Sequence, residues 1–245
     1  MRKSSIAFIL LLAFAFTACK SEEKKETKTE TKTEKKVYVK ETKVDLGYFF
    51  PIQPEPMVYS YALDNNPLSE NFLKITSAKS KFGEYRMLLE HYNGSLVLTE
   101  GLTIDVSNGF KTLNQAVASK GTKFEAHLSS PFYFPASETD TSRFISDFPT
   151  TNDSIVMLIE VDRYFNGSRP VALGDSVVDC KIITERWRKT EINISTRKEN
   201  VTQFGSDMYF AKNMGKVAFI PHGEKDTMKL RKVIPIRDWE RLVNN

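Results

Sequence analysis

Three histidines and two cysteines carry most of the reactive chemistry in this sequence, and their spacing favours no catalytic or metal site. His91, His127 and His222 are far apart in the chain, and scattered histidines are more often structural than metal-binding. Glu90 adjoins His91, but neighbouring strand residues point to opposite faces, so the two make a poor acid–base pair. The sequence contains no phosphate-binding loop, serine elbow or His-Glu-x-x-His helix. We therefore assign no catalytic residue, no metal and no cofactor, and an enzymatic role stays open.

The segment before Cys19 has the layout of a secretory signal peptide, residues 1–18, with a basic start and an apolar run over Ile6–Phe16. This run is too short to cross a bilayer, which takes roughly 20 apolar residues. Residues 16–19, Phe-Thr-Ala-Cys, resemble the lipobox of bacterial lipoproteins. That resemblance implies cleavage before Cys19, lipidation of its sulfur with palmitate-type acyl chains, and anchoring in a lipid bilayer. A plain secretory signal with a cysteine near its cut site is the alternative.

Cys180 is the only other cysteine, so a lipidated Cys19 leaves it without a disulfide partner. It lies within Val177–Ile183, a run rich in β-branched residues, where a cysteine usually behaves as a small buried hydrophobe. No histidine or helix start stands nearby in sequence to lower the pKa of its thiol. We expect Cys180 to be buried and unreactive.

Residues 19–43 follow as a tether. Positions 20–36 hold only Lys, Glu, Thr and Ser, so they have nothing apolar to bury and cannot offset the entropy of ordering. Lys20-Ser21-Glu22-Glu23 resembles the signal that sends some Bacteroidota lipoproteins to the outer face of the outer membrane. We expect outer-membrane anchoring, with the periplasmic and cell-surface faces both open.

The charge balance argues against a nucleic-acid partner. The formal net charge is +4, and removal of Arg2 and Lys3 with the signal peptide lowers it to +2. A nearly neutral mature chain lacks the basic footprint that nucleic-acid binding requires.

Residues 44–245 are expected to form one β-rich domain. Alternating or β-branched runs recur from Met57 to Ile220, separated by turn signals such as Asn93-Gly94 and Asn166-Gly167, which predict tight hairpins. Helices are predicted only at Leu113–Ser119 and at Arg237–Val243. The pattern predicts a mostly β fold, a curved antiparallel sheet forming a half-barrel or sandwich, with one or two short helices.

The stretch Ser129–Asp153 is rich in Ser, Thr, Asp and Pro and predicts a long loop. Phe132, Tyr133 and Phe134 stand within it. These aromatics either form a rim that contacts a ligand or staple the loop onto the sheet. The basic run Arg186–Lys189 is interpreted as a solvated strand face.

Several motifs resemble uncharacterised Bacteroidota lipoproteins. Tyr48-Phe49-Phe50-Pro51 is similar to their Tyr-Phe-Pro start, and the aromatic run Val58–Tyr61 is similar to their first strand. Tyr209–Val217 is similar to their Tyr-Ala-Lys-Gly-x-Gly hairpin, although Phe210 is inserted and Asn213 replaces the first glycine. The resemblance implies a curved antiparallel sheet wrapped on itself, and it brings no catalytic residue.

Two functions fit these expectations. The first is a membrane-anchored envelope lipoprotein that acts as a non-enzymatic binding module for an amphiphilic ligand or a partner protein, using the concave face of its sheet. The alternative is a surface lipoprotein that binds or cleaves glycans. In both, Cys19 is the lipidation site, and Phe132, Tyr133 and Phe134 are candidate ligand contacts.

Overall fold

The computed structural model describes residues 45–49, 52–79, 81, 83–107, 109–119 and 121–244. Cys19, the expected signal peptide and the expected tether lie outside these residues. No described helix is long and apolar enough to cross a membrane.

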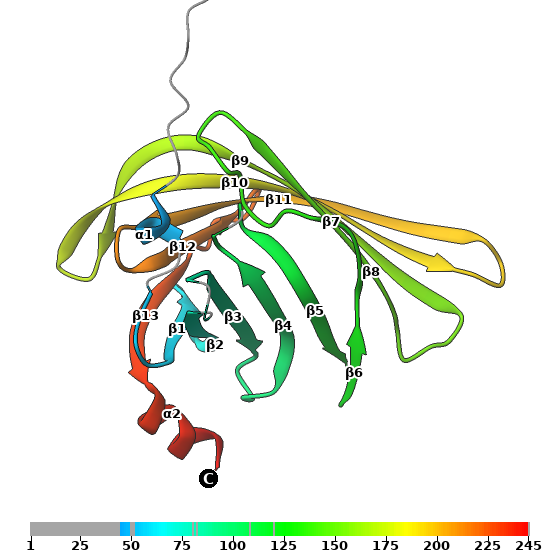
Figure 1. Ribbon diagram of the computed structural model, residues 1–245, viewed down its shortest axis with the longest axis horizontal. Helices are drawn as coiled ribbons and strands as arrows, with labels where there is room; N and C mark the ends of the chain where they lie inside the picture. Colours follow the sequence, from blue (N-terminus) through cyan, green and yellow to red (C-terminus); the bar gives the residue numbers. More distant parts are fainter. Residues whose placement is uncertain are drawn as a thin grey trace, which may run out of the picture. The chain divides into compact units, whose positions relative to one another are not determined.

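Thirteen antiparallel strands form one continuous, strongly curved sheet (Figure 1). The first six strands are β1 (Met57–Leu63), β2 (Asn66–Lys79), β3 (Tyr85–Tyr92), β4 (Leu98–Asp105), β5 (Lys111–Ser119) and β6 (Thr122–Glu125). The other seven are β7 (His127–Pro131), β8 (Thr141–Pro149), β9 (Ile155–Leu173), β10 (Ser176–Asn193), β11 (Lys198–Ala211), β12 (Gly215–Pro221) and β13 (Met228–Pro235). Two short helices, α1 (Leu46–Phe49) and α2 (Ile236–Val243), complete the described structure. The expected mostly β, antiparallel fold is confirmed.

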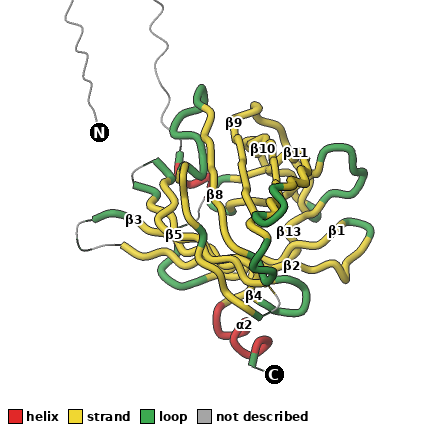
Figure 2. Tube along the Cα trace, turned by 90° about the vertical axis from the view of Figure 1, so that its right-hand side faces the viewer, coloured by secondary structure: helices red, strands yellow, loops and turns green. Residues whose placement is uncertain are grey.

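The sheet is a nearly closed ring with one break. Each strand pairs with its neighbours in the chain, and β13 returns to pair with β1, from Met57↔Pro235 to Leu63↔Met228. The only consecutive strands that do not pair are β6 and β7, which are joined through Ala126. A single bridge, Lys111↔Phe132, spans this break. In both views β9, β10 and β11 lie on one side of the interior and β1 to β4 on the other (Figures 1 and 2).

Two of the Asn-Gly dipeptides, Asn93-Gly94 and Asn166-Gly167, have different structural roles. Asn93-Gly94 lies in the turn between β3 and β4, where the Asn93 carboxamide oxygen accepts hydrogen bonds from the backbone N–H groups of Ser95 and Val97. The hairpin predicted at Asn166-Gly167 is wrong, because both residues lie inside β9. They face the single residue Ile182 of β10, and Gly167 has φ +83°, so they form a β-bulge. Such a bulge bends a long strand without ending it.

Two further sequence predictions need correction. The helix predicted at Leu113–Ser119 is part of β5, which pairs with β4 and β6, so pairing on both sides outweighs local helix propensity. The loop predicted over Ser129–Asp153 contains the end of β7 and all of β8, and its irregular parts are 132–140 and 150–153. The C-terminal helix, in contrast, is present as α2 and begins directly after Pro235.

The core has two parts on opposite faces of the sheet. The large part fills the interior of the ring and includes Cys180, which is buried as expected, with its pKa raised to about 11 by burial. A smaller cluster on the outer face joins Trp239 of α2 to Val58, Phe72 and Ile234 of the sheet.

Candidate binding site

One end of the interior is filled by aromatic side chains around Phe49 of α1. Ring centroids of Phe210, Phe134, Phe110 and Phe165 lie 5.0, 5.2, 5.6 and 5.8 Å from that of Phe49. Edge-on packing of this kind adds stability beyond the apolar area that it buries. We call this cluster the aromatic end.

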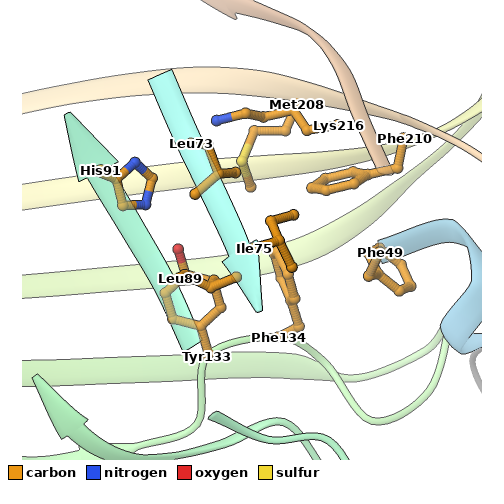
Figure 3. A pocket seen from close by; sticks show the side chains of 10 residues that line it. All are labelled: Phe49, Leu73, Ile75, Leu89, His91, Tyr133, Phe134, Met208, Phe210 and Lys216. Carbon is orange, nitrogen blue, oxygen red and sulfur yellow. The ribbon is translucent and has the colours of Figure 1, made fainter. Parts of the chain in front are cut away.

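A small inner cavity of about 30 Å³ lies beside the aromatic end (Figure 3). Its lining is apolar except for His91, Lys216 and the hydroxyl of Tyr133. A space of this size holds one or two water molecules, because a water needs roughly 10–15 Å³ of such volume. It is too small for an organic ligand.

The main cavity, about 240 Å³, adjoins the inner cavity and shares Tyr133 with it. Its walls come from both sides of the break between β6 and β7, with β4 and β5 on one side and β8, β9 and β10 on the other. The apolar part of the lining is Val117, Tyr133, Phe144, Phe148, Ile159 and Trp187, and the polar part is Thr99, Glu100, Gln115 and Arg163. An apolar pocket with a few convergent polar groups is the usual form of a small-molecule site.

A fully buried ion pair stands behind the main cavity. Arg163 and Glu185 are 1% and 3% exposed, and the Arg163 Nε lies 2.6 Å from the Glu185 Oε1. The other carboxylate oxygen accepts hydrogen bonds from the Trp187 indole and the Ser206 hydroxyl. The Arg163 guanidinium also donates to the Tyr133 carbonyl and lies 4.2 Å from the centre of the Tyr133 ring. Both charges are therefore well satisfied, and they fix Trp187 and Tyr133 in the cavity wall.

Glu100 and Gln115 form a second polar group on the opposite wall. The Gln115 Nε2 donates a 2.7 Å hydrogen bond to the Glu100 Oε1. The other Glu100 oxygen lies 4.0 Å from the His91 Nε2, beyond hydrogen-bond distance. Burial lowers the pKa of His91, with a smaller opposing effect from Glu100, so its imidazole is neutral at neutral pH.

Lys216 lines the inner cavity beside these groups. Burial lowers the pKa of its ammonium, and its Nζ lies 5.0 Å from the centre of the Tyr61 ring. Among the described residues, no carboxylate lies within ion-pair distance of this Nζ, so the aromatic face is its nearest stabilising contact.

The candidate ligand contacts of the sequence do not share one surface. Phe132 is 50% exposed, whereas Phe134 is 4% exposed and packs in the aromatic end. Tyr133 lines both cavities, and burial raises the pKa of its hydroxyl. Of these three aromatic residues, only Tyr133 lines the main cavity.

The three histidines do not converge. His91 faces the interior, His127 pairs with Asp147 at 2.9 Å, and His222 lies 3.3 Å from Asp207. Within the described part of the chain, no group of three His, Cys, Asp or Glu side chains has an arrangement that would hold a metal ion.

An outer groove of about 270 Å³ carries two carboxylates, Glu160 and Asp162 of β9. The Glu160 carboxylate lies 2.9 Å from Arg143 and 3.6 Å from Arg188, and Asp162 lies 3.8 Å from Arg143. These contacts describe a surface ion-pair ladder and not the acid and base of a glycosidase, which must be free to exchange protons with substrate.

Sequence reasoning missed the polar residues of the site, although a signal for two of them was present. Arg163 has the same strand phase as the inward residues Val161 and Phe165, and Glu185 has the same phase as Ile183 and Trp187. A charged residue in the apolar phase of a strand indicates a buried, paired charge. Gln115 and Lys216 carry no comparable signal.

No protein-family model matches the sequence, and no curated protein matches it. Two solved structures are similar to this chain. A candidate lipoprotein from Parabacteroides distasonis is 11% identical, with a TM-score of 0.46 over 76% of this chain and 99% of that one. The hypothetical lipoprotein YmcC from Escherichia coli is 15% identical, with a TM-score of 0.36 over 75% of this chain and 86% of that one. Neither likeness brings a ligand, an activity or a residue role to this chain.

Proposed function

We propose that this protein is a lipid-anchored envelope lipoprotein whose main cavity binds the apolar part of a small amphiphilic ligand, without catalysis. The observation that carries the proposal is the 240 Å³ main cavity, with aromatic and aliphatic walls and polar groups gathered on part of its lining. A cavity of about 150 Å³ already admits a ligand of the size of benzene, so this volume accommodates a short alkyl chain or a ring.

Anchoring rests on the sequence around Cys19. A lipidated cysteine, followed by a tether of Lys, Glu, Thr and Ser, would hold the β domain at the outer membrane and away from the bilayer surface. The Cys19→Ala variant tests this directly. We expect loss of label from radioactive palmitate and loss of the protein from the membrane fraction. Unchanged labelling and membrane retention would contradict the anchor.

Ligand binding can be followed through Trp187. The chain has two tryptophans, and Trp239 belongs to α2 and packs on the outer face of the sheet, away from the cavity. In a Trp239→Phe background, Trp187 becomes the sole indole reporter, and it lines the main cavity. We expect octanol to change its fluorescence in a saturable manner.

A cavity-filling pair of variants supplies the control. Val117→Phe places a ring in the main cavity and should abolish the octanol response, whereas Leu113→Phe makes a similar change at an exposed position of the same strand. An equal response in both variants, or no saturable response in the parent protein, would contradict binding in the main cavity.

The glycan alternative receives less support from the geometry. The aromatics at 132–134 do not form an exposed platform, and Glu100 is the only carboxylate among the described residues that line the main cavity. Glycosidases of the usual kinds need two carboxylates facing the substrate. We therefore favour the amphiphile.

A further inference from the structure

The lining of the main cavity contains a buried acceptor that has no donor. Gln115 is 3% exposed, and its Oε1 has no hydrogen-bond partner among the described residues. The amide orientation is fixed because its Nε2 donates to Glu100, and an ionised carboxylate can only accept. A buried carbonyl oxygen without a partner costs free energy, so a donor supplied by a ligand at this point would stabilise the complex.

A second free acceptor lies beside the first. The Glu100 side chain is 32% exposed, and within the described part of the chain its Oε2 has no ion-pair partner except the His91 Nε2, at 4.0 Å. Because burial keeps His91 neutral, this imidazole does not neutralise the carboxylate. The Gln115 Oε1 and the Glu100 Oε2 thus present two acceptors, one of them charged, on the same wall of the main cavity.

Among the described residues, neither of the two nearby cations pairs with Glu100. The charge of Arg163 is balanced by Glu185, to which its Nε donates, and its Nη1 donates to the Tyr133 carbonyl. Lys216 lines the inner cavity and is absent from the lining of the main one. The polar lining of the main cavity therefore offers a ligand mainly hydrogen-bond acceptors and negative charge.

We infer that the main cavity selects amphiphiles whose head donates hydrogen bonds, an alkylammonium before a hydroxyl, and discriminates against carboxylate heads. The head would bind Gln115 Oε1 and the Glu100 carboxylate, with the alkyl chain against Val117, Phe148 and Ile159. This inference rests on the proposed function and adds the ligand class to it. A charge-assisted hydrogen bond is about twice as strong as a neutral one, which sets the expected order of heads.

Three probes of eight carbons each test the head group: octylamine, octanol and octanoate, titrated at neutral pH against Trp187 fluorescence in the Trp239→Phe protein. We expect octylamine to bind about tenfold or more tightly than octanoate, with octanol between them. Equal affinities would overturn the selectivity but leave the proposed function standing. Tighter binding of octanoate would overturn the acceptor assignment in favour of Arg163 or Lys216. Absence of binding by all three would overturn both proposals.

Two variants locate the selectivity. Glu100→Gln should reduce the preference for octylamine over octanol to within about threefold, because the charge is lost while a polar group of similar shape remains.

Glu90→Gln is the matched control. Glu90 is on the outer face of β3, where it pairs with Lys74 at 2.8 Å, and its substitution should leave the preference unchanged. An equal effect of both variants would overturn the role of Glu100. If Glu100→Gln unfolds, the head-group order in the parent protein still decides the inference.

Discussion

The aromatic end and the main cavity lie inside the same sheet and differ in what fills them. At the aromatic end, rings pack around Phe49 with centroids 5.0–5.8 Å apart and leave an inner cavity of about 30 Å³. Around the main cavity, an arginine, two glutamates and a glutamine stand among aromatic walls that leave about 240 Å³ unfilled. Burying charges beside an unfilled space does little for stability by itself, and this difference supports the binding role that we propose for the main cavity.

The largest expected effect comes from breaking the ion pair that supports the main cavity. Arg163→Met leaves the Glu185 carboxylate buried with its charge unpaired and should lower the free energy of unfolding by about 3–5 kcal/mol. Denaturation with urea, followed by circular dichroism, measures this.

The double variant Arg163→Met with Glu185→Met removes both charges and should recover most of the loss. Arg143→Met is the surface control, expected to cost about 1 kcal/mol or less, since Arg143 is 57% exposed. A small effect of Arg163→Met would show that the pair is not a structural support.

A slightly smaller effect is expected at the aromatic end. Phe49→Ala removes the ring at the centre of the cluster and should cost about 3 kcal/mol by opening a void among the neighbouring rings. The exposed Phe132 gives the comparison, because Phe132→Ala should change stability by about 0.5 kcal/mol or less. If the two variants unfold at the same urea concentration, the aromatic end is not the main source of stability.

Adding a ring should destabilise the packed core more than the main cavity. Val217 is fully buried in the packed core, and Val217→Phe should cost about 1–3 kcal/mol through overpacking. Val117→Phe adds the same atoms beside empty volume and should cost less than about 1 kcal/mol. Thermal unfolding of both variants checks the difference. Equal destabilisation would mean that the main cavity cannot accept a ring.

Local patterns in the sequence predicted the fold class, but they did not distinguish a turn from a bulge. Asn93-Gly94 and Asn166-Gly167 carry the same sequence signal, because Asn-Gly is typical of the positive φ that turns and bulges use. In the structure Gly167 has φ +83°, whereas the residue with positive φ in the turn after Asn93 is Leu96, at +60°. What decides between them is pairing with β10, which is set by contacts distant in the sequence. The closure of the ring through Met57↔Pro235 is likewise a property of tertiary structure.

The candidate site was predictable only in part, for a similar reason. The concave face was expected to hold the ligand, and Arg163 and Glu185 stand in the apolar phase of their strands, so their burial was open to inference. The contact of Gln115 with Glu100, in contrast, depends on the register between β4 and β5, where Glu100 faces Val117 and Gln115 faces Leu102. That register includes a shift near Thr103, which no local pattern specifies.

The smallest expected effect is a pH dependence of the folding stability that arises from His91 in the cavity region. Burial lowers the pKa of His91 below its ordinary value of 6.5, and Lys216 adds to this while Glu100 and Glu185 oppose it. Well above pH 6.5 the residue is neutral in both states and contributes nothing to pH dependence. As the pH falls below 6.5, the unfolded state takes up a proton that the folded state resists, so stability declines, by at most about 1.4 kcal/mol per pH unit.

Comparison of urea unfolding across this range should show that the stability of His91→Gln declines less steeply than that of the parent protein. A slope that is unchanged in His91→Gln would mean that burial does not keep this imidazole neutral, and the cavity region would then be as open to solvent as the surface.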